Sequence, residues 1–401
     1  MSTTMRTWQS LLFTARNLHF AAAFAICVLY LGNLHFNPDL SRKNDLYFGA
    51  DCDRVLENLK DSNDRWTHYR DRLHPFFSIV AVTVAKVPAA VGISGKEFVF
   101  YRLFFGTFGA LLFFALLYRE TSPLQSFASL AMLLSTLSFR LFSTLPESFL
   151  FGFFTIMLAL YLARAGANPI AVLIASMASA TTNIALGVIH TWRSLTSFKQ
   201  AVQIAVGFLT IAVLLAVIQR NMYPTSDYFF NVLAVKDETR YMTRALGALP
   251  FRAFDFLFSG FAMPLDASLT PPIDSPGEWR AFLAHGYWSK RATLAVALSI
   301  AGVAVLYLTS AFVFFANKRR GELSTLLCGF FVFEFVFHMI YGESAYGDSP
   351  FLFSLHFVPV IILFFSLHRL KKFEAVYPPL FIGMALLFQY VNLYNFDAIF
   401  R

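Results

Sequence analysis

Apolar stretches long enough to cross a membrane recur along almost the whole chain and constrain its fold more than any other feature. The clearest lie near residues 98–118, 200–218, 292–316 and 374–394. A helix needs about 20 apolar residues to cross a hydrocarbon core about 30 Å thick, and only helices and closed barrels satisfy their backbone polar groups there. Only 14% of the residues are charged, against about 25% in an average soluble domain. The sequence therefore predicts an all-α, multi-pass membrane protein whose main solvent is the lipid bilayer.

We expect about eleven spans in a polytopic transmembrane helical bundle. They belong to a single membrane-embedded domain, residues 1–401, with a core module at 1–220 and C-terminal helices at 291–401. The first span lies near 17–36, and the later apolar segments lie near 75–92, 98–118, 123–141, 147–164, 169–195, 200–218, 292–316, 322–341, 350–367 and 374–394.

Two polar segments are much longer than the other connections. The first, residues 37–74, is rich in Asp, Arg and His, and Val55, Leu56 and Leu59 give it one short apolar face. That pattern predicts an interfacial helix lying on the membrane surface. The second, residues 219–290, contains several prolines and further amphipathic pieces. Two large loops on a helical bundle suggest a built active site.

Clusters of Lys and Arg between the spans indicate the orientation of the chain. Such residues gather in the cytoplasmic loops of membrane proteins, and here they occur at 318–320, near 369–372, and at Arg193 and Lys199. This assignment puts both large loops on the non-cytoplasmic face of a cell inner membrane. The net charge of +8 is divided among short clusters and forms no continuous stripe, which argues against nucleic-acid binding.

The middle of the chain allows two arrangements. A lysine and a proline interrupt the 75–92 segment, so it lies either in the interface or across the membrane. In the first arrangement, the 169–195 segment holds two short spans, and Arg119 and Arg164 lie inside. In the second, the four middle spans are reversed. We favour the first because it places two more charged loops on the cytoplasmic side.

Acidic residues and a His-Pro motif follow the first span in a recognisable order. Asp51 and Asp53 lie within the first large loop, and His74-Pro75 opens the apolar run after it. This arrangement resembles the GT-C superfamily of polyprenyl-phosphate-sugar glycosyltransferases, whose members carry acidic residues after the first span, then a surface helix, then a His-Pro or Pro-Pro motif. The resemblance covers the first 220 residues, and the later half matches only in layout. The spaced Asp-Cys-Asp differs from the adjacent acidic pair of some members and leaves the catalytic position open between Asp51 and Asp53.

Two further features carry the resemblance. Arg102 resembles the outer-edge arginine of the superfamily, and the turn that contains Arg140 and Glu147 is similar to its arginine-containing turn with an acidic residue. The resemblance implies a GT-C-type fold, a sugar donor linked to polyprenyl phosphate, and a glycan, lipid or protein acceptor of the cell envelope. It leaves a divalent cation open as a cofactor, because members of the superfamily differ in metal dependence.

The expected inverting transfer needs a base and a site for the leaving phosphate. A carboxylate takes the proton from the acceptor hydroxyl as that oxygen attacks the anomeric carbon, and we assign this role to Asp51. Arg presents a planar fork that fits phosphate oxygens, so Arg102 and Arg140 are the first candidates for the phosphate site. The second group of candidates, all from the first loop, is Arg70, Arg72 and His74.

These side chains also have ordinary structural roles. An Asp in an outer loop is usually solvated, and an Arg at the edge of a span usually extends to lipid head groups. Asn183, within an apolar segment, either joins helices or lines a cavity. Glu147 is the stronger candidate for chemistry, because a carboxylate inside a membrane is costly and tends to be functional.

A second group of polar residues lies near the C-terminus. Glu334 and His338 are four residues apart on one helical face, and Glu343 and His356 lie about the next outer turn. Because both imidazoles stand alone in apolar runs, a hydrogen bond that joins helices is favoured over a metal site. We expect Glu343 and His356 to lie near the donor or acceptor cavity.

Two other functions compete with the transferase. A transporter or lipid flippase would have a similar number of spans, but such proteins usually show repeats and short loops, which this sequence does not. A scaffold or anchoring protein would need no acidic residue at the base of the loop.

Overall fold

The computed structural model describes residues 3–34, 52–60, 73–231, 249–262, 293–317, 321–341 and 353–400, with side chains except at 3–13, 53, 251, 293 and 394–400. Every regular element in these ranges is a helix. Within them, six helices are long and apolar enough to cross a membrane: Thr14–Asn33, Glu97–Tyr118, Phe198–Met222, Leu294–Ala316, Glu322–Ile340 and Lys371–Leu393. The prediction of an all-helical, multi-pass membrane protein is confirmed at this level.

The helices follow the expected apolar segments closely. The longer ones are α1 (Thr3–Asn33), α6 (Glu97–Tyr118), α7 (Pro123–Ser135), α9 (Phe149–Arg164), α12 (Phe198–Met222), α16 (Thr293–Ala316), α17 (Glu322–Ile340), α18 (Ser354–Leu367) and α19 (Tyr377–Phe400). The shorter ones are α3 (Cys52–Lys60), η2 (Phe77–Val82), α4 (Thr83–Ala85), α5 (Val87–Ala90), α8 (Leu137–Phe142), α10 (Pro169–Met177), η3 (Thr181–Asn183), α11 (Ile184–Ser194), α14 (Leu249–Phe254), η6 (Asp255–Ser259) and η8 (Lys371–Val376).

At the centre of the bundle, helices pack closely through small residues and aromatic rings. α6 packs against α9, where Gly109 lies directly under the Phe153 ring. Phe105 makes edge-on contacts with Phe151 at 5.2 Å and Phe154 at 5.3 Å between ring centroids. Edge-to-face aromatic pairs add stability beyond the apolar area they bury. Many of the phenylalanines therefore serve packing between helices.

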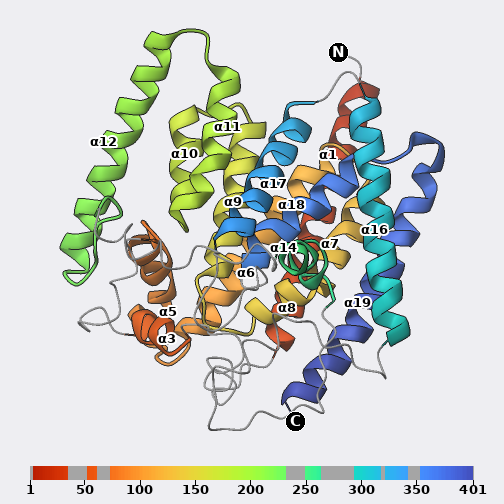
Figure 1. Cartoon of the computed structure of the whole chain (residues 1–401), viewed down its shortest axis with the longest axis horizontal. Helices are drawn as coiled ribbons and strands as arrows, with labels where there is room; N and C mark the ends of the chain where they lie inside the picture. The colour runs from red at the N-terminus through yellow and green to blue at the C-terminus, as the bar shows by residue number, and fades with distance from the viewer. Residues whose placement is uncertain are drawn as a thin grey trace.

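The middle of the chain is divided into helices as the first arrangement expects, but none of the helices within 75–92 and 169–195 is among the six long enough to cross a membrane. Residues 75–92 form the short helices η2, α4 and α5, and 169–195 divides into α10 and α11, which pack against each other. At the far end of α9, Arg164 pairs with Glu120 at 2.5 Å, and Arg119 donates to the Tyr161 hydroxyl at 3.1 Å. These basic residues lie at the same end of the bundle as the α11–α12 turn (Figure 1).

The helix expected in the first large loop exists, but its apolar face meets protein. α3 packs against α6 and η2, and the side chains of Val55 and Leu59 are fully buried. The sequence predicted that this face would rest on the membrane surface. An apolar stripe is buried equally well by lipid or by neighbouring helices, and only the fold decides between them.

A helical segment of the second large loop enters the bundle. η6 ends beside the break between α7 and α8, where the backbone N–H groups of Leu137 and Ser138 donate to the carbonyls of Phe261 and Gly260, each at 3.0 Å. The Asn392 amide of α19 also donates to the Phe261 carbonyl at 3.1 Å. The first N–H groups of a helix have no partner within the helix, so α8 obtains its acceptors from this segment.

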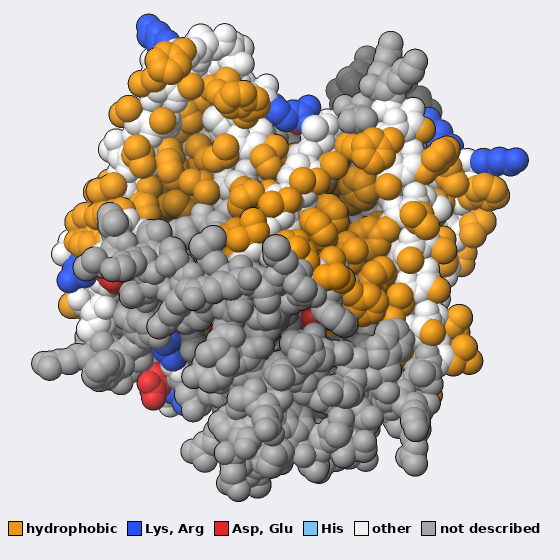
Figure 2. Space-filling model, viewed as in Figure 1, with side chains coloured by type: hydrophobic (Ala, Val, Ile, Leu, Met, Phe, Trp, Pro, Cys, Tyr) orange, Lys and Arg blue, Asp and Glu red, His pale blue; other side chains and the backbone are white. Residues whose placement is uncertain are grey.

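The two ends of the bundle differ in character. In Figure 1, the N-terminus and the α11–α12 turn lie at the upper end, whereas α3, α5 and α8 lie at the lower end. Apolar side chains cover the long helices in a broad band (Figure 2), as expected of helices that face lipid.

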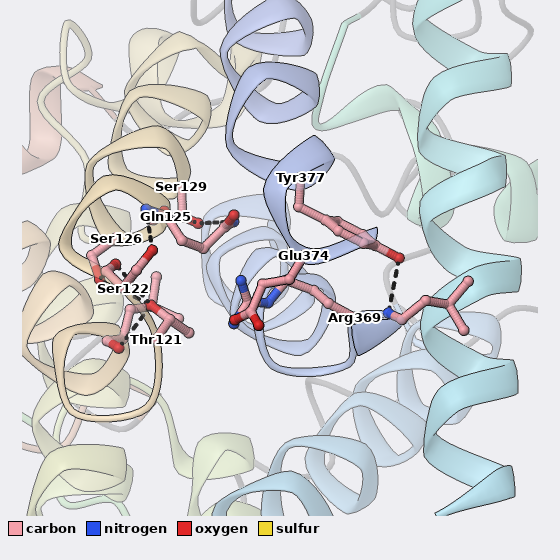
Figure 3. A network of polar contacts seen from close by, with 10 residues as sticks. Thr121, Ser122, Gln125, Ser126, Ser129, Arg369, Glu374 and Tyr377 are labelled. Carbon is pink, nitrogen blue, oxygen red and sulfur yellow. Dashed lines mark hydrogen bonds and ion pairs between the residues drawn. The ribbon is translucent and has the colours of Figure 1, made fainter. Parts of the chain in front are cut away.

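At the end where α7 begins, polar side chains connect α7 to α18 and η8 (Figure 3). Ser122 caps α7 by accepting from the Gln125 N–H, and Ser129 bonds to Ser366 of α18 at 2.8 Å. Arg369 pairs with Glu374 at 3.4 Å in the same view. Buried hydroxyl pairs of this kind join helices inside membranes.

Candidate functional site

The predicted site residues that the structure describes lie on or beside α6, α8, α9, η3, α18 and the segment before η2. Of the other candidates, Asp51, Arg70, Arg72 and Glu343 lie outside the described residues, and Asp53 lies in α3 with its side chain outside them. The structure therefore places six of the candidates: His74, Arg102, Arg140, Glu147, Asn183 and His356.

His74 joins the end of the first large loop to the break between α10 and α11. Its Nδ1 bonds to the Ser179 carbonyl. On either side, the Phe76 N–H donates to the Ala178 carbonyl and the Thr181 N–H donates to the Leu73 carbonyl, each at 3.1 Å. The break between α10 and α11 leaves backbone groups at the helix ends without partners inside a helix. The segment around His74-Pro75 provides hydrogen-bond partners for these groups.

A buried cluster of hydroxyl and amide groups lies under this junction. Thr155 of α9 donates to the Ser179 hydroxyl at 3.0 Å, and the Asn183 amide nitrogen donates to the same oxygen at 3.2 Å. Asn183 is 1% exposed, and its Oδ1 has no hydrogen-bond partner among the described residues. Buried polar atoms are normally paired, so this oxygen is a candidate to receive a donor from a ligand.

Glu147 is held where α9 begins. Its Oε2 accepts from the Ser148 N–H at 3.0 Å, and its backbone carbonyl accepts from the Tyr101 hydroxyl at 2.8 Å. The same hydroxyl accepts from the Phe151 N–H at 3.2 Å. Tyr101 thus fixes the turn that carries this carboxylate, and the start of a helix favours negative charge.

The two candidate arginines flank the lower end of α1. Arg102 is 3% exposed and its Nη1 donates to the Leu34 carbonyl at 2.8 Å, so it does not extend to lipid head groups. Its Nε has no hydrogen-bond partner among the described residues. Arg140 is in α8, whose Phe139 ring lies 6.3 Å from the Tyr30 ring of α1 between ring centroids.

His356 lies deeper, between α18 and α9. Its ring is so close to Gly152 that a methyl group there would collide with Nε2. The Phe149 ring of α9 lies 5.8 Å from it between ring centroids. The expectation that Glu343 and His356 lie near the donor or acceptor cavity stays a prediction, and Glu343 lies outside the described residues.

Glu334 and His338 form a buried pair within one helix. Their Oε2 and Nε2 atoms are 3.1 Å apart in α17, and both side chains are 2% exposed. The expected bond between helices is instead a bond within α17. The link to another helix comes from Arg252 of α14, whose guanidinium donates to the carbonyls of His338 and Tyr341 at the end of α17.

An apolar groove of about 600 Å³ lies beside the His74 junction. α9, α10, α12 and η2 line it, with Phe76, Ile79, Phe151 and Leu215 among its side chains. Thr155 also lines it, and so connects the groove to the hydroxyl cluster.

Sequence reasoning missed Tyr101, Ser179, Thr155 and Arg252. Arg252 had a detectable signal, because it and Asp255 interrupt the apolar run 249–262 three residues apart. The sequence gives no signal for Ser179 and Thr155, because Ser and Thr are common in membrane helices, and none for Tyr101.

Among the described residues, no group of three or more His, Cys, Asp or Glu side chains is placed to hold a metal ion.

The chain was also compared with known proteins. No protein-family model, curated protein or solved structure matches it.

Proposed function

We propose that the chain is a GT-C-type glycosyltransferase with about eleven spans. It takes a sugar from a polyprenyl-phosphate carrier and transfers it, with inversion, to a glycan, lipid or protein acceptor. The reaction takes place on the non-cytoplasmic face of the cell inner membrane. Asp51 acts as the base, with Asp53 as the alternative, and Glu147 lines the same site.

One observation carries the proposal: an apolar groove and the buried polar junction at the His74-Pro75 motif share the residues Phe76, Thr155 and Ala178. A lipid-linked sugar needs an apolar surface for its chain and polar groups for its head in one continuous site. One wall of the groove, α12, is largely exposed on the outside of the bundle, so a lipid can enter from the bilayer beside it.

Buried polar atoms without partners among the described residues suit the head of such a donor. The Nε of Arg102 and the hydroxyl of Tyr30 are buried without hydrogen-bond partners among the described residues, as is the Oδ1 of Asn183. An unpaired buried polar group costs about 1–3 kcal/mol, which a ligand recovers by pairing with it. Phosphate oxygens suit the arginine, and sugar hydroxyls suit the amide oxygen.

A transporter is the second candidate, and the broken α10–α11 pair favours it. Transporters often place substrate at interrupted helices near the middle of the membrane. The two functions differ in outcome, because a transporter moves a lipid-linked sugar without removing the sugar from its carrier.

The proposal is tested by mass spectrometry of lipids from native host cells that lack this protein. Complementing chains are the wild type, Asp51→Asn, and Glu57→Gln, a control that changes an exposed carboxylate of α3. We expect a polyprenyl-phosphate sugar to accumulate in the deletion strain and with Asp51→Asn, and to return to normal with the wild type and Glu57→Gln. A lipid profile that is the same in every strain would contradict the transferase proposal.

A further inference from the structure

The side-chain amide of Gln219 lies inside the first helical turn after His74-Pro75. Gln219 is near the end of α12 and is 1% exposed. Its Nε2 donates to the Pro75 carbonyl at 2.8 Å, and its Oε1 accepts from the Ile79 N–H at 3.0 Å. In an α-helix, these two backbone groups would bond directly to each other, four residues apart. The amide therefore replaces one backbone hydrogen bond with two bonds to α12.

The inserted amide coincides with an unusual helix geometry. Residues 77–82 form the π-helix η2, and the Phe77 N–H donates to the His74 carbonyl at 3.0 Å. Insertion of a side chain into the backbone ladder is an established cause of helix distortion, and π-helical turns are frequent at functional sites. The distorted turn begins at His74, so the amide and the candidate site share one short piece of backbone.

α12 has few other attachments to the bundle. Its buried residues are Ile204, Phe208, Ala212, Ala216 and Gln219. One turn beyond Gln219, the Tyr223 hydroxyl bonds to Thr83 at 3.2 Å. One turn before it, Leu215 lines the apolar groove. Gln219 thus connects a wall of the groove directly to the backbone beside His74.

We infer that Gln219 is a positioning residue. Through its inserted amide, α12 sets the backbone of residues 75–79, and with it the place of the His74 imidazole and of Phe76 at the end of the groove. A lipid chain in the groove contacts Leu215, which is on the same helix as Gln219. A shift of α12 caused by the lipid would therefore also shift the backbone beside His74. The inference rests on the proposed function, because His74 and the groove belong to the proposed donor site.

Two substitutions separate the inserted hydrogen bonds from the volume of the side chain. Gln219→Leu keeps the size and removes both bonds, together with the bond from Nε2 to the Ser226 hydroxyl at 3.2 Å. Gln219→Glu gives a group that can replace the amide only when neutral, because a carboxylic acid has one donor and one acceptor whereas a carboxylate only accepts. The matched control is Thr83→Val, which removes a partly buried hydrogen bond between Thr83 and Tyr223, beyond the end of α12, and leaves the inserted amide in place.

The first readout is sugar transfer by purified protein in lipid nanodiscs, followed against pH. We expect Gln219→Leu to lower kcat about 10- to 100-fold at every pH, since small misplacement of a binding group has effects of that size. Gln219→Glu is expected to approach wild-type activity at low pH and to lose it as pH rises through the pKa of the new carboxyl group. His74, Lys86 and Arg220 on the flanking segments are unchanged, so the wild-type profile supplies the baseline.

The second readout is hydrogen exchange of peptides that cover residues 73–85, which needs no activity. Gln219→Leu should exchange faster there than the wild type, and Thr83→Val should match the wild type. Wild-type activity or wild-type exchange in Gln219→Leu overturns the inference, as does a Gln219→Glu profile parallel to that of the wild type. If the wild type transfers no sugar, the proposed function falls, and exchange alone decides whether Gln219 sets this turn.

Discussion

At the scale of single residues, buried polar groups hold the lower end of the bundle together. The Tyr101 hydroxyl is both donor to the Glu147 carbonyl and acceptor from the Phe151 N–H. It therefore bonds to backbone on both sides of the start of α9. The aromatic ring is fully buried among Phe98, Phe105 and other rings, so water cannot replace these bonds.

We predict that Tyr101→Phe destabilises the protein by about 1–3 kcal/mol, the cost of leaving buried polar groups without a partner. The measurement is the unfolding rate in detergent at fixed temperature. The control is Tyr161→Phe, which removes a hydroxyl that accepts from Arg119 at the exposed end of the bundle. Equal unfolding rates for Tyr101→Phe and Tyr161→Phe would show that the Tyr101 hydroxyl contributes no more to stability than an exposed hydroxyl does.

At the scale of helices, close crossings set the distances between elements. α9 approaches α18 at Gly152, where the His356 ring occupies the space that a side chain would need. α19 offers a contrast, because Gly383 has no heavy atom within 4 Å of the place where a Cβ would lie. Alanine at Gly152 therefore tests the tight packing, and alanine at Gly383 is the control without such packing.

We predict that Gly152→Ala lowers stability by about 1–3 kcal/mol because it overpacks the α9–α18 contact. Gly383→Ala should be neutral or stabilising by up to about 1 kcal/mol, since alanine is the better helix former. Thermal denaturation of the two variants beside the wild type gives the comparison. A Gly152→Ala protein as stable as Gly383→Ala would contradict the tight contact with His356.

At the scale of the whole molecule, the two ends of the bundle define an orientation. Lys199 is exposed at the α11–α12 turn, whereas Ser94 is exposed between α5 and α6 at the opposite end (Figure 1). The proposed function requires the Ser94 end to face away from the cytoplasm, in agreement with the distribution of Lys and Arg.

We predict that a membrane-impermeant maleimide added to intact spheroplasts labels Ser94→Cys and leaves Lys199→Cys unlabelled until the membrane is opened. The unsubstituted protein measures the background from native cysteines, of which Cys27 and Cys52 are buried. Labelling of Lys199→Cys from outside would reverse the orientation and remove the basis for a non-cytoplasmic site.

Much of the fold could be predicted because the bilayer imposes strong rules on sequence. Helices α6, α9 and α17 begin and end within a few residues of the expected apolar segments. The division of 169–195 into two short helices also followed from charge placement and length. Such features depend on local composition, because the hydropathy of each segment determines whether that segment lies in the membrane.

The candidate site was predictable only in part. His74, Asn183 and Glu147 stood out as polar residues in or beside apolar runs, and the structure joins His74 and Asn183 through Ser179. Tyr101, Ser179 and Gln219 did not stand out, because their importance comes from partners that are distant in sequence: Tyr101 bonds to residue 147, and Gln219 to residues 75 and 79.

The sequence alone determined that this protein is a helical, multi-pass membrane protein, where most of its helices lie, and which polar residues are costly to bury. Only the tertiary structure decided that α3 packs on protein, that the segment 249–262 enters the bundle, and that Gln219 replaces a backbone hydrogen bond beside His74. The physical reason is that burial in lipid depends on each segment by itself, whereas hydrogen bonds and close contacts between helices depend on which segments meet.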